Sequence, residues 1–535
     1  MSMASPTYFP SRRSAILARH GMVATSQPLA AVAGLRALMD GGNAADAAVT
    51  VAAMLNVVEP MSTGIGGDCF ALIFEAGSGQ VAALNGSGRA PAALTLEEAQ
   101  RRDLVEMPVT GPLPVTVPGA VSGWAALLER FGTRSLADCL APAIAAAEEG
   151  FPVSERISAG WQRSVDKLSQ DPEASRVYLP APKPGDLHRQ PDLARTFRTI
   201  AAGGAEAFYH GPLAERIAGY VQSRGGYLTT GDLALHTATW ETPIRTTYRQ
   251  VEVLEHPPNG QGLAALIALN IVAGYGLGGI DYFDPARWHV MIEAMRLGMA
   301  DAACYVADPA MAEVPVSRLI SKEYAAQRRA LIRPDRALEL ATPGQPEHRD
   351  TVYLTAVDGQ GNAVSFINSL YDGFGSGLVV PRTGICLQNR GAGFTLEPGH
   401  PNALVGGKRP YHTIIPAMAL RDGRLWLSFG VMGGFMQPQG HLQVLVNLID
   451  YGLNPQAALD APRFRVDEKG EAGVAIETGV PLKTRKALAA MGHDVLSETT
   501  FAPMFGSGDI VAVDPETSVL WGGSDPRKDG CAVGF

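Results

Sequence analysis

The chain has 535 residues, of which 46% are hydrophobic, so it is long enough to bury a large core. Its formal net charge of −9 argues against a nucleic-acid-binding protein, because such a protein normally presents a basic face. Only 18% of the residues are charged, whereas there are 60 glycines and 38 prolines, a composition typical of a compact, turn-rich enzyme and not of a disordered chain.

Neither the cysteines nor the amino terminus point to a secreted or membrane protein. The cysteines have neither metal-ligand nor redox spacing, so we expect reduced thiols in the core. No apolar segment follows Arg12-Arg13 that would make a signal peptide, and no run of about 18 apolar residues predicts a membrane span. We therefore expect a cytoplasmic protein with no membrane or nucleic-acid partner and no metal or organic cofactor. The cysteines are Cys69, Cys139, Cys304, Cys386 and Cys531.

The first 310 residues predict helices and short strands in mixed order. Strands are predicted over 21–26, 71–75, 81–85, 239–250 and 251–256, and helices over 30–40, 44–56, 118–130, 135–150, 263–275 and 286–308. Residues 153–235 are more polar, so we expect peripheral helices there. The loop over 59–70 is rich in glycine, but it joins a helix to a strand, the reverse of a dinucleotide-binding fingerprint. A tight turn is therefore favoured over a phosphate site.

Charged residues on the helix predicted over 286–308 have a structural interpretation. Acids and bases three or four positions apart share a helix face, so we expect ion pairs at the surface or between helices. Their spacing does not make a metal site. Beyond residue 350, strands are predicted at 417–420 and 425–429 and a helix over 440–451. Long helices together with several hairpins predict an α+β fold in which helices cover the sheets. The charged residues are Glu293, Arg296, Asp301 and Asp308.

A hairpin that begins at Thr351 is the feature with the clearest chemistry. A polar, proline-containing segment over 334–348 precedes it and is typical of an exposed, cleavable linker. Apolar and small polar residues alternate over 352–356, a turn follows at Asp358-Gly359-Gln360-Gly361, and a second strand covers 363–367. We hypothesise that the chain is cut between Asp350 and Thr351. Thr351 would then carry both a hydroxyl nucleophile and the α-amine that activates it.

Short motifs along nearly the whole chain carry a resemblance to a known family. In the first part they are Gly41-Gly42-Asn43-Ala44-Ala45-Asp46-Ala47-Ala48, Val58-Glu59-Pro60, Gly64-Ile65-Gly66-Gly67, Ala141-Pro142-Ala143-Ile144 and Ala147-Glu148-Glu149-Gly150-Phe151-Pro152-Val153. In the second part they are Val357-Asp358, Gly361-Asn362-Ala363-Val364-Ser365, Phe374-Gly375-Ser376-Gly377, Gly433-Gly434, Ala461-Pro462-Arg463-Phe464 and Ser524-Asp525-Pro526-Arg527. In these motifs the sequence resembles the γ-glutamyltranspeptidase (glutathione hydrolase) family of N-terminal-nucleophile hydrolases, and within it the cytosolic glutathione hydrolase-like branch.

The resemblance implies a four-layer αββα sandwich formed by a proenzyme that cuts itself. Residues 1–350 would be a large, mostly helical subunit that contributes strands to the core sandwich, and residues 351–535 a small catalytic subunit. The two subunits would stay together as one catalytic unit, and the resemblance leaves a homodimer open.

The resemblance also implies catalytic roles. Thr351 Oγ would attack the Asp350 carbonyl, an N-to-O acyl shift would give an ester, and water would release the new amino terminus. Gly433 and Gly434 match the glycine pair whose N–H groups form the family's oxyanion hole, a plain tight turn being the alternative. Thr355 lies on the same strand face as Thr351, which indicates either a supporting role or an ordinary buried strand threonine.

The substrate-binding positions depart from the family pattern. The arginine that holds the γ-glutamyl carboxylate would fall at Ser87, while Arg89 lies two residues further, a displacement of about 6–7 Å along a strand. The position of the acid that meets the substrate ammonium is Gly393, and Arg390 stands where the family has an amide. Removing a carboxylate and adding a guanidinium favours an anionic substrate that lacks the α-amine. The predicted substrate-binding residues are Arg89, Ser369, Arg390, His412 and Thr413, with Tyr371 in place of a small amide.

Three functions therefore remain open. The first is a self-processing threonine amidohydrolase or acyltransferase that cleaves a γ-glutamyl-type amide such as glutathione through an acyl-enzyme on Thr351. The second is an amidohydrolase for a non-amino-acid acyl amide, either oxamate-like or of the cephalosporin or glutaryl acylase type. The third is an unprocessed, non-catalytic binding protein. Thr351, Gly433 and Gly434 together favour the enzymes, because function follows the site and not the fold.

Overall fold

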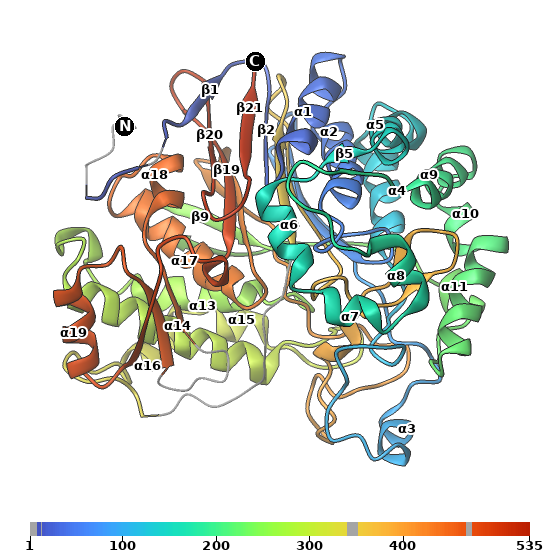
Figure 1. Cartoon of the computed structure of the whole chain (residues 1–535). Coiled ribbons are helices and arrows are strands. Elements are labelled where there is room, and N and C mark those ends of the chain that lie inside the picture. The colour runs from blue at the N-terminus through green and yellow to red at the C-terminus, as the bar shows by residue number, and fades with distance from the viewer. Residues whose placement is uncertain (1–7, 12, 340–350, 467–472) are drawn as a thin grey trace.

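Two antiparallel sheets of seven strands each form the centre of the molecule (Figure 1). The computed structural model describes residues 8–11, 13–339, 351–466 and 473–535. The first sheet has the order β21 (Cys531–Gly534), β2 (Met22–Thr25), β10 (Val352–Val357), β11 (Ala363–Ser369), β3 (Asp68–Glu75), β4 (Gln80–Gly86) and β7 (Thr239–Glu241). The second has the order β1 (Ile16–Ala18), β20 (Leu520–Ser524), β19 (Ser507–Val513), β15 (Arg424–Met432), β14 (Ala417–Arg421), β9 (Val251–Glu255) and β8 (Ile244–Tyr248). Each sheet thus combines strands from both sides of Thr351.

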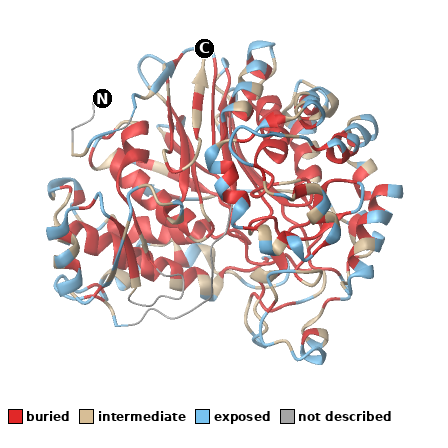
Figure 2. Ribbon diagram, viewed as in Figure 1, coloured by how far each residue is buried: buried red, intermediate tan, exposed pale blue. Residues whose placement is uncertain are grey.

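The sheets pack on each other through an apolar layer and are covered by helices on their outer faces. Met22, Leu72, Met418 and Val511 lie in the layer between them. The helices α1 (Pro28–Met39), α2 (Ala44–Val58) and α4 (Ala120–Phe131) pack on the first sheet, and α13 (Gly262–Val272), α17 (Met436–Ile449) and α18 (Pro455–Asp460) pack on the second. All 15 residues of the alanine-rich α2 are buried, because small side chains let the helix approach the sheet and its helical neighbours closely (Figure 2).

The remaining elements surround this centre. The other helices are α3 (Leu96–Arg101), α5 (Leu136–Glu149), α6 (Glu155–Gln162), α7 (Val165–Ser169), α8 (Pro172–Tyr178), α9 (Pro191–Gly203), α10 (Glu206–Tyr209), α11 (Gly211–Ser223), α12 (Thr230–Ala234), α14 (Pro285–Tyr305), α15 (Val316–Leu319), α16 (Lys322–Arg329) and α19 (Leu482–Ala490). Short strands are β5 (Phe151–Pro152), β6 (Leu187–His188), β12 (Val379–Val380), β13 (Ile385–Cys386), β16 (Phe464–Val466), β17 (Gly473–Glu477) and β18 (Asp494–Glu498). None of the described helices is long and apolar enough to cross a membrane.

Several sequence predictions are confirmed. The hairpin exists, with β10 paired to β11 in antiparallel register, although the strand begins at Val352, one residue after Thr351. All five cysteines are free thiols, but Cys304 is exposed and Cys531 is only partly buried, so the expectation of core thiols holds for three of them. The glycine-rich loop is a site of close approach, as expected. A Cβ on Gly66 would lie 2.1 Å from the Cys386 carbonyl oxygen, and one on Gly67 would lie 2.3 Å from that of Ser369.

Other predictions are wrong. The strand expected over 239–250 is two strands in different sheets, β7 and β8, separated by Pro243, which has no N–H for a ladder. The segment over 153–235 is helical but not merely peripheral, since Trp161 and Phe197 are fully buried beneath polar outer faces.

Two acids of α14, Asp301 and Glu293, differ in their ion-pair partners and in burial. Asp301 pairs with Arg328 of α16 at 2.9 Å, the expected link between helices. Glu293 is fully buried instead, and its carboxylate pairs with Arg296 of its own helix.

Candidate functional site

Thr351 lies at the edge of the first sheet, next to the end of its hairpin partner. Because Val352 of β10 pairs with Asn368 of β11, Thr351 falls opposite Ser369, the last residue of that strand. The two hydroxyl oxygens are 3.1 Å apart, and both side chains are almost completely buried. The predicted nucleophile and one predicted binding residue therefore meet through local hairpin geometry alone.

Ser369 connects Thr351 to Arg390. Arg390 Nη2 donates to Ser369 Oγ at 3.3 Å, and Nη1 donates to Thr413 Oγ1 at 2.8 Å. The guanidinium carbon also lies 3.9 Å from the centre of the Tyr371 ring, a cation–π distance. Tyr371 has a φ of +83°, and its N–H donates to Ser369 Oγ at 2.8 Å. The structure thus brings Thr351, Ser369, Arg390 and Thr413 together in one buried cluster.

His412 turns away from this cluster toward Asp68. His412 Nε2 lies 3.1 Å from Asp68 Oδ2, while its Nδ1 accepts a hydrogen bond from the Ile414 N–H. Burial, with the Arg390 charge nearby, holds the pKa of His412 well below its ordinary value. Burial raises the pKa of Asp68 to about 6, opposed by Arg390 and by three hydrogen bonds. At neutral pH a neutral His412 therefore donates to an Asp68 carboxylate.

The structure does not bring Arg89 into the cluster. Burial lowers the pKa values of Arg409 and His236, and the Arg89 charge adds to both shifts. In the described part of the chain, no hydrogen bond or ion pair joins the Arg89 side chain to Thr351, Ser369 or Arg390. Ser87 is buried nearby and donates to Asn85 Oδ1 at 2.7 Å.

Thr355 lies deeper between the two sheets. Its hydroxyl donates to Ser428 Oγ of β15 at 2.6 Å, so it joins the first sheet to the second. Tyr353 stands between it and Thr351 on the same strand face, with its hydroxyl 2.7 Å from Ser365 Oγ. Thr355 makes no hydrogen bond to Thr351 in the structure as described.

Lys528 and Glu59 hold the other side of Thr351, and neither was predicted from the sequence. Lys528 Nζ donates to the Thr351 carbonyl oxygen at 3.0 Å and forms an ion pair with Glu59. Glu59 also accepts from Ser26 Oγ at 2.6 Å and from Ser62 Oγ at 2.9 Å. Both residues belong to or follow motifs that carried the resemblance, Val58-Glu59-Pro60 and Ser524-Asp525-Pro526-Arg527, which was the only signal for them.

A cavity of about 90 Å³ opens on this side of Thr351 and has room for several water molecules. Its lining includes Thr351, Gly433 and Lys528, together with Arg156 and Arg163 from the region of α6. The two arginines are exposed. Sequence analysis missed this wall because it assigned the whole region to the periphery.

Gly433 and Gly434 form the turn between β15 and α17. Their φ angles are +116° and +61°, values that glycine adopts readily and other residues rarely. The Gly433 carbonyl accepts from the Met436 N–H, and the Gly434 carbonyl accepts from Gln261 Nε2 at 2.9 Å. Neither glycine N–H donates a hydrogen bond to another described residue. Asp350, the other half of the predicted cleavage site, lies outside the described residues.

Comparisons with known proteins identify the family of the chain. The model of the family described as Gamma-glutamyltranspeptidase matches residues 30–535. The glutathione hydrolase-like YwrD proenzyme of Bacillus subtilis (strain 168) is 38% identical over 96% of this chain and 98% of its own. The oxamate amidohydrolase proenzyme of Klebsiella pneumoniae is 36% identical over 98% of this chain and 100% of its own.

A solved structure gives the same result. The crystal structure of cephalosporin acylase from Bacillus halodurans matches with a TM-score of 0.91 and 46% identity, covering 99% of this chain and 98% of that one. The resemblance found in the sequence motifs is confirmed. The chain belongs to the γ-glutamyltranspeptidase family of amide hydrolases.

Proposed function

We propose that the chain is a threonine amidohydrolase that first cuts itself between Asp350 and Thr351. The relatives named above are described as proenzymes, and Thr351 begins the hairpin next to a second hydroxyl, Ser369. Since both sheets mix strands from 1–350 and 351–535, the two pieces would stay together as one catalytic unit. The two packed sheets with helices on both outer faces support the four-layer αββα assignment.

The surroundings of Thr351 support a division of roles in amide cleavage. Two N–H donors point at Ser369 Oγ, which favours Ser369 as the donor in its bond to Thr351 Oγ1. The Thr351 proton is then free to pass to the new α-amine, a group that titrates near neutrality. We assign the oxyanion hole to the N–H groups of Gly433 and Gly434. Lys528 holds the Thr351 carbonyl and with it the position of the nucleophile.

The observation that carries the choice of substrate is the lack of space at Gly393. A Cβ at this position would lie 2.7 Å from the Tyr411 carbonyl oxygen, so the backbone leaves no room for the acidic side chain that would meet an α-ammonium. Arg390 meanwhile places a positive charge near Thr351, because its guanidinium donates to Ser369 Oγ, which is itself hydrogen-bonded to Thr351 Oγ1. We therefore propose an acyl group that carries a carboxylate but no α-amine, as in a glutaryl or oxamate-like amide.

A γ-glutamyl amide is the second candidate, and kinship favours it through the glutathione hydrolase-like relative. It would need an acid for the substrate ammonium, and Asp68 is the acid whose charge acts on Arg390. Asp68 Oδ1 already accepts from the N–H groups of Gly88 and Gly119 and from Gln388, and Oδ2 faces His412. Asp68 is thus engaged in holding the fold around Arg390, which argues for the first candidate.

A matched pair of substrates tests this choice. Glutaryl 4-nitroanilide and γ-glutamyl 4-nitroanilide differ only in the α-amine, so the ratio of their kcat/KM values isolates that group. The protein is first shown by N-terminal sequencing to be cut at Thr351. We then expect kcat/KM to be at least about tenfold higher for the glutaryl compound than for the γ-glutamyl compound. A factor of about ten is what the loss of one hydrogen bond to a charged group typically costs. Equal or better turnover of the γ-glutamyl compound would contradict the assignment at Gly393. An uncut, inactive chain would support the binding protein instead.

A further inference from the structure

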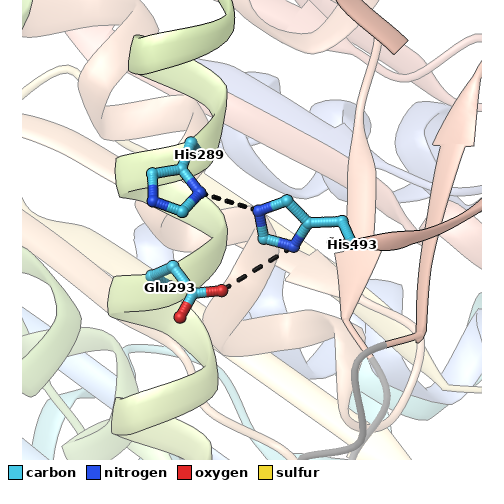
Figure 3. A group of neighbouring side chains, drawn as sticks. All are labelled: His289, Glu293 and His493. Atoms are coloured by element: carbon cyan, nitrogen blue, oxygen red, sulfur yellow. Dashed lines mark hydrogen bonds and ion pairs between the residues drawn. The ribbon is translucent and has the colours of Figure 1, made fainter. Parts of the chain in front are cut away.

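A second cluster of reactive side chains lies away from Thr351, beneath the helix α14 (Figure 3). His289 and Glu293 are four residues apart on α14 and so lie on one face of the helix. His493 comes from the segment between α19 and β18 and points at both of them (Figure 3). All three side chains are completely shielded from solvent. The proposed reaction uses none of them.

The hydrogen bonds fix where the protons sit on the two rings. His289 Nε2 lies 2.6 Å from the Arg333 carbonyl oxygen, which can only accept, so Nε2 carries the proton. His289 Nδ1 is then a lone pair, and it lies 2.8 Å from His493 Nε2, which must donate to it. His493 Nδ1 is consequently a second lone pair when that ring is neutral. A proton on His493 Nδ1 would have no acceptor within hydrogen-bond distance in the described part of the chain, so the geometry favours the neutral ring.

This second lone pair has no donor. His493 Nδ1 makes no hydrogen bond in the described part of the chain and faces Glu293 Oε1 at 3.7 Å. Two electron-rich atoms therefore point at each other in a buried place, an arrangement that costs free energy unless a positive group lies between them.

We propose that His289, Glu293 and His493 bind one divalent transition-metal ion, with zinc as the ion of choice. Two imidazoles and one carboxylate suit zinc and its neighbours better than magnesium or calcium, which prefer oxygen ligands alone. One ligand atom from each residue lies within 4.8 Å of the others. Zinc bonds of about 2.0–2.2 Å bring tetrahedral ligands to about 3.3–3.5 Å apart. An ion would therefore move His493 Nδ1 and Glu293 Oε1, now 3.7 Å apart, only slightly, would draw the most widely separated ligand atoms, up to 4.8 Å apart, together by about an ångström, and would replace the hydrogen bond between the two rings.

The groups around the cluster are arranged as outer contacts of such a site. The Arg333 carbonyl fixes the orientation of His289, and the Leu338 N–H donates to Glu293 Oε2 at 3.1 Å. Arg296 Nη1 shares the Glu293 carboxylate at 2.9 Å, but it also donates to the Leu338 carbonyl at 3.0 Å and keeps that bond when the carboxylate turns to an ion. Since Arg296 already compensates the carboxylate, the site is expected to bind more weakly than an isolated set of the same ligands.

The ion would fasten parts of the molecule that lie far apart in the sequence. His289 and Glu293 precede Thr351, His493 follows it, and the bonds to Arg333 and Leu338 hold the stretch that leads toward the proposed cleavage site. If the chain is cut as proposed, the ion joins the two subunits. Binding itself does not require the cut.

Metal content tests the proposal on the full-length chain, both wild type and Thr351→Ala, so that the result does not depend on cleavage. After incubation with zinc and removal of the excess by gel filtration, we expect one zinc per chain by mass spectrometry. His289→Gln and His493→Gln should each lose it, whereas the matched control His210→Gln, at an exposed histidine, should retain it. Cobalt in place of zinc should give the visible absorption bands of a tetrahedral site in the wild type and in His210→Gln, but not in His289→Gln or His493→Gln.

Melting curves keep the test decisive if a variant folds poorly. Zinc should raise the melting temperature of the wild type and of His210→Gln by several degrees and leave folded His493→Gln unchanged, because an ion that binds only the folded state stabilises it. The proposal is overturned if the wild type holds no more zinc than the double variant His289→Gln/His493→Gln. It is likewise overturned if zinc raises the melting temperature of His493→Gln as much as that of the wild type. The three residues would then be a hydrogen-bonded network without an ion.

Discussion

The two sides of Thr351 differ in access to water and in how their charges are held. On one side Ser369, Arg390 and Thr413 are completely buried and joined by hydrogen bonds. On the other side lies a cavity whose lining includes Thr351, Lys528 and the exposed Arg156 and Arg163. A buried guanidinium discriminates strongly by charge because the surroundings screen little, whereas exposed arginines are screened by water. We therefore expect the buried side to select the acyl group and the open side to exchange water and the leaving amine.

The largest effect is expected from removing the Thr351 hydroxyl, which lies between the two sides. Thr351→Ala should leave a single uncut chain and lower amide hydrolysis at least about a thousandfold, because both proposed steps use the same hydroxyl. A denaturing gel and a glutaryl 4-nitroanilide assay measure the two effects. Thr351→Ser keeps a hydroxyl and should still be cut, more slowly. Cleavage of the alanine variant at the same bond would remove Thr351 from the mechanism.

On the buried side, Asp68 should make stability depend on pH. Its pKa is raised from 3.8 to about 6, so the folded protein keeps a proton between pH about 4 and 6 that the unfolded chain has released. The contribution of this carboxyl to stability therefore falls as pH rises through that interval, by about 3 kcal/mol for about two pKa units. Asp68→Asn should remove this fall. Melting temperatures of both forms in the uncut Thr351→Ala background measure it, and parallel curves from pH 4 to 7 would contradict it.

Arg390 should govern selection of the acyl charge. Arg390→Gln should lower kcat/KM for glutaryl 4-nitroanilide about 10- to 100-fold, the loss of a charged hydrogen bond worth about 1.5–3 kcal/mol. The uncharged valeryl 4-nitroanilide should change little, because it makes no such bond. Arg89→Gln is the matched control, since no hydrogen bond or ion pair among the described residues joins the Arg89 side chain to the cluster. If Arg89→Gln lowered kcat/KM for glutaryl 4-nitroanilide more than Arg390→Gln does, the substrate carboxylate would be assigned to Arg89 and not to Arg390.

On the open side, Lys528 should affect self-cleavage more than selectivity. Lys528→Met removes the charged bond to the Thr351 carbonyl and should slow processing about tenfold, with the same slowing for both nitroanilides. Gel time courses of freshly synthesised protein measure the rate. Arg156→Gln changes the same cavity without touching Thr351 and should be processed normally. Equal slowing in both variants would show that the charge of the cavity, and not the bond, matters.

The smallest effect is expected between the sheets. Thr355→Val keeps the shape of the side chain and removes its bond to Ser428, so it should lower the free energy of unfolding by about 1 kcal/mol and leave turnover within about twofold. Urea titration of the uncut background and the nitroanilide assay separate the two quantities. A tenfold loss of turnover with unchanged stability would give Thr355 the supporting role near the nucleophile that the sequence left open.

Local patterns predicted the parts of the site that depend on neighbours in the chain. Thr351 and Ser369 meet because a hairpin with a short turn pairs the start of one strand with the end of the next, and residue spacing determines that register. The turn at Gly433-Gly434 follows from two residues that tolerate positive φ. Composition and periodicity likewise predicted the alanine-rich α2 and the mixture of helices and sheets.

Contacts between distant segments could not be predicted in the same way. Arg89 was expected at the end of a strand, but β4 ends at Gly86, and whether the Arg89 side chain reaches Thr351 depends on how the segment after β4 packs against residues far along the chain. His412 was grouped with Thr413 by adjacency, yet neighbouring residues face different ways, and His412 found Asp68. Lys528 contacts Thr351 across 177 positions, and His493 contacts His289 across 204.

The sequence by itself determined the hairpin that begins next to Thr351, the glycine turn at Gly433-Gly434 and the family, because these rest on residue type and short spacing. Only the tertiary structure decided that Arg390 and not Arg89 is hydrogen-bonded to Ser369, the neighbour of Thr351, that Gly393 has no room for an acid, and that Lys528 and Glu59 lie on the other side of Thr351. It alone brought His493 to His289 and Glu293. The physical reason is that side-chain charge and shape are local properties, whereas which charges share a buried volume is decided by the packing of two sheets and their helices.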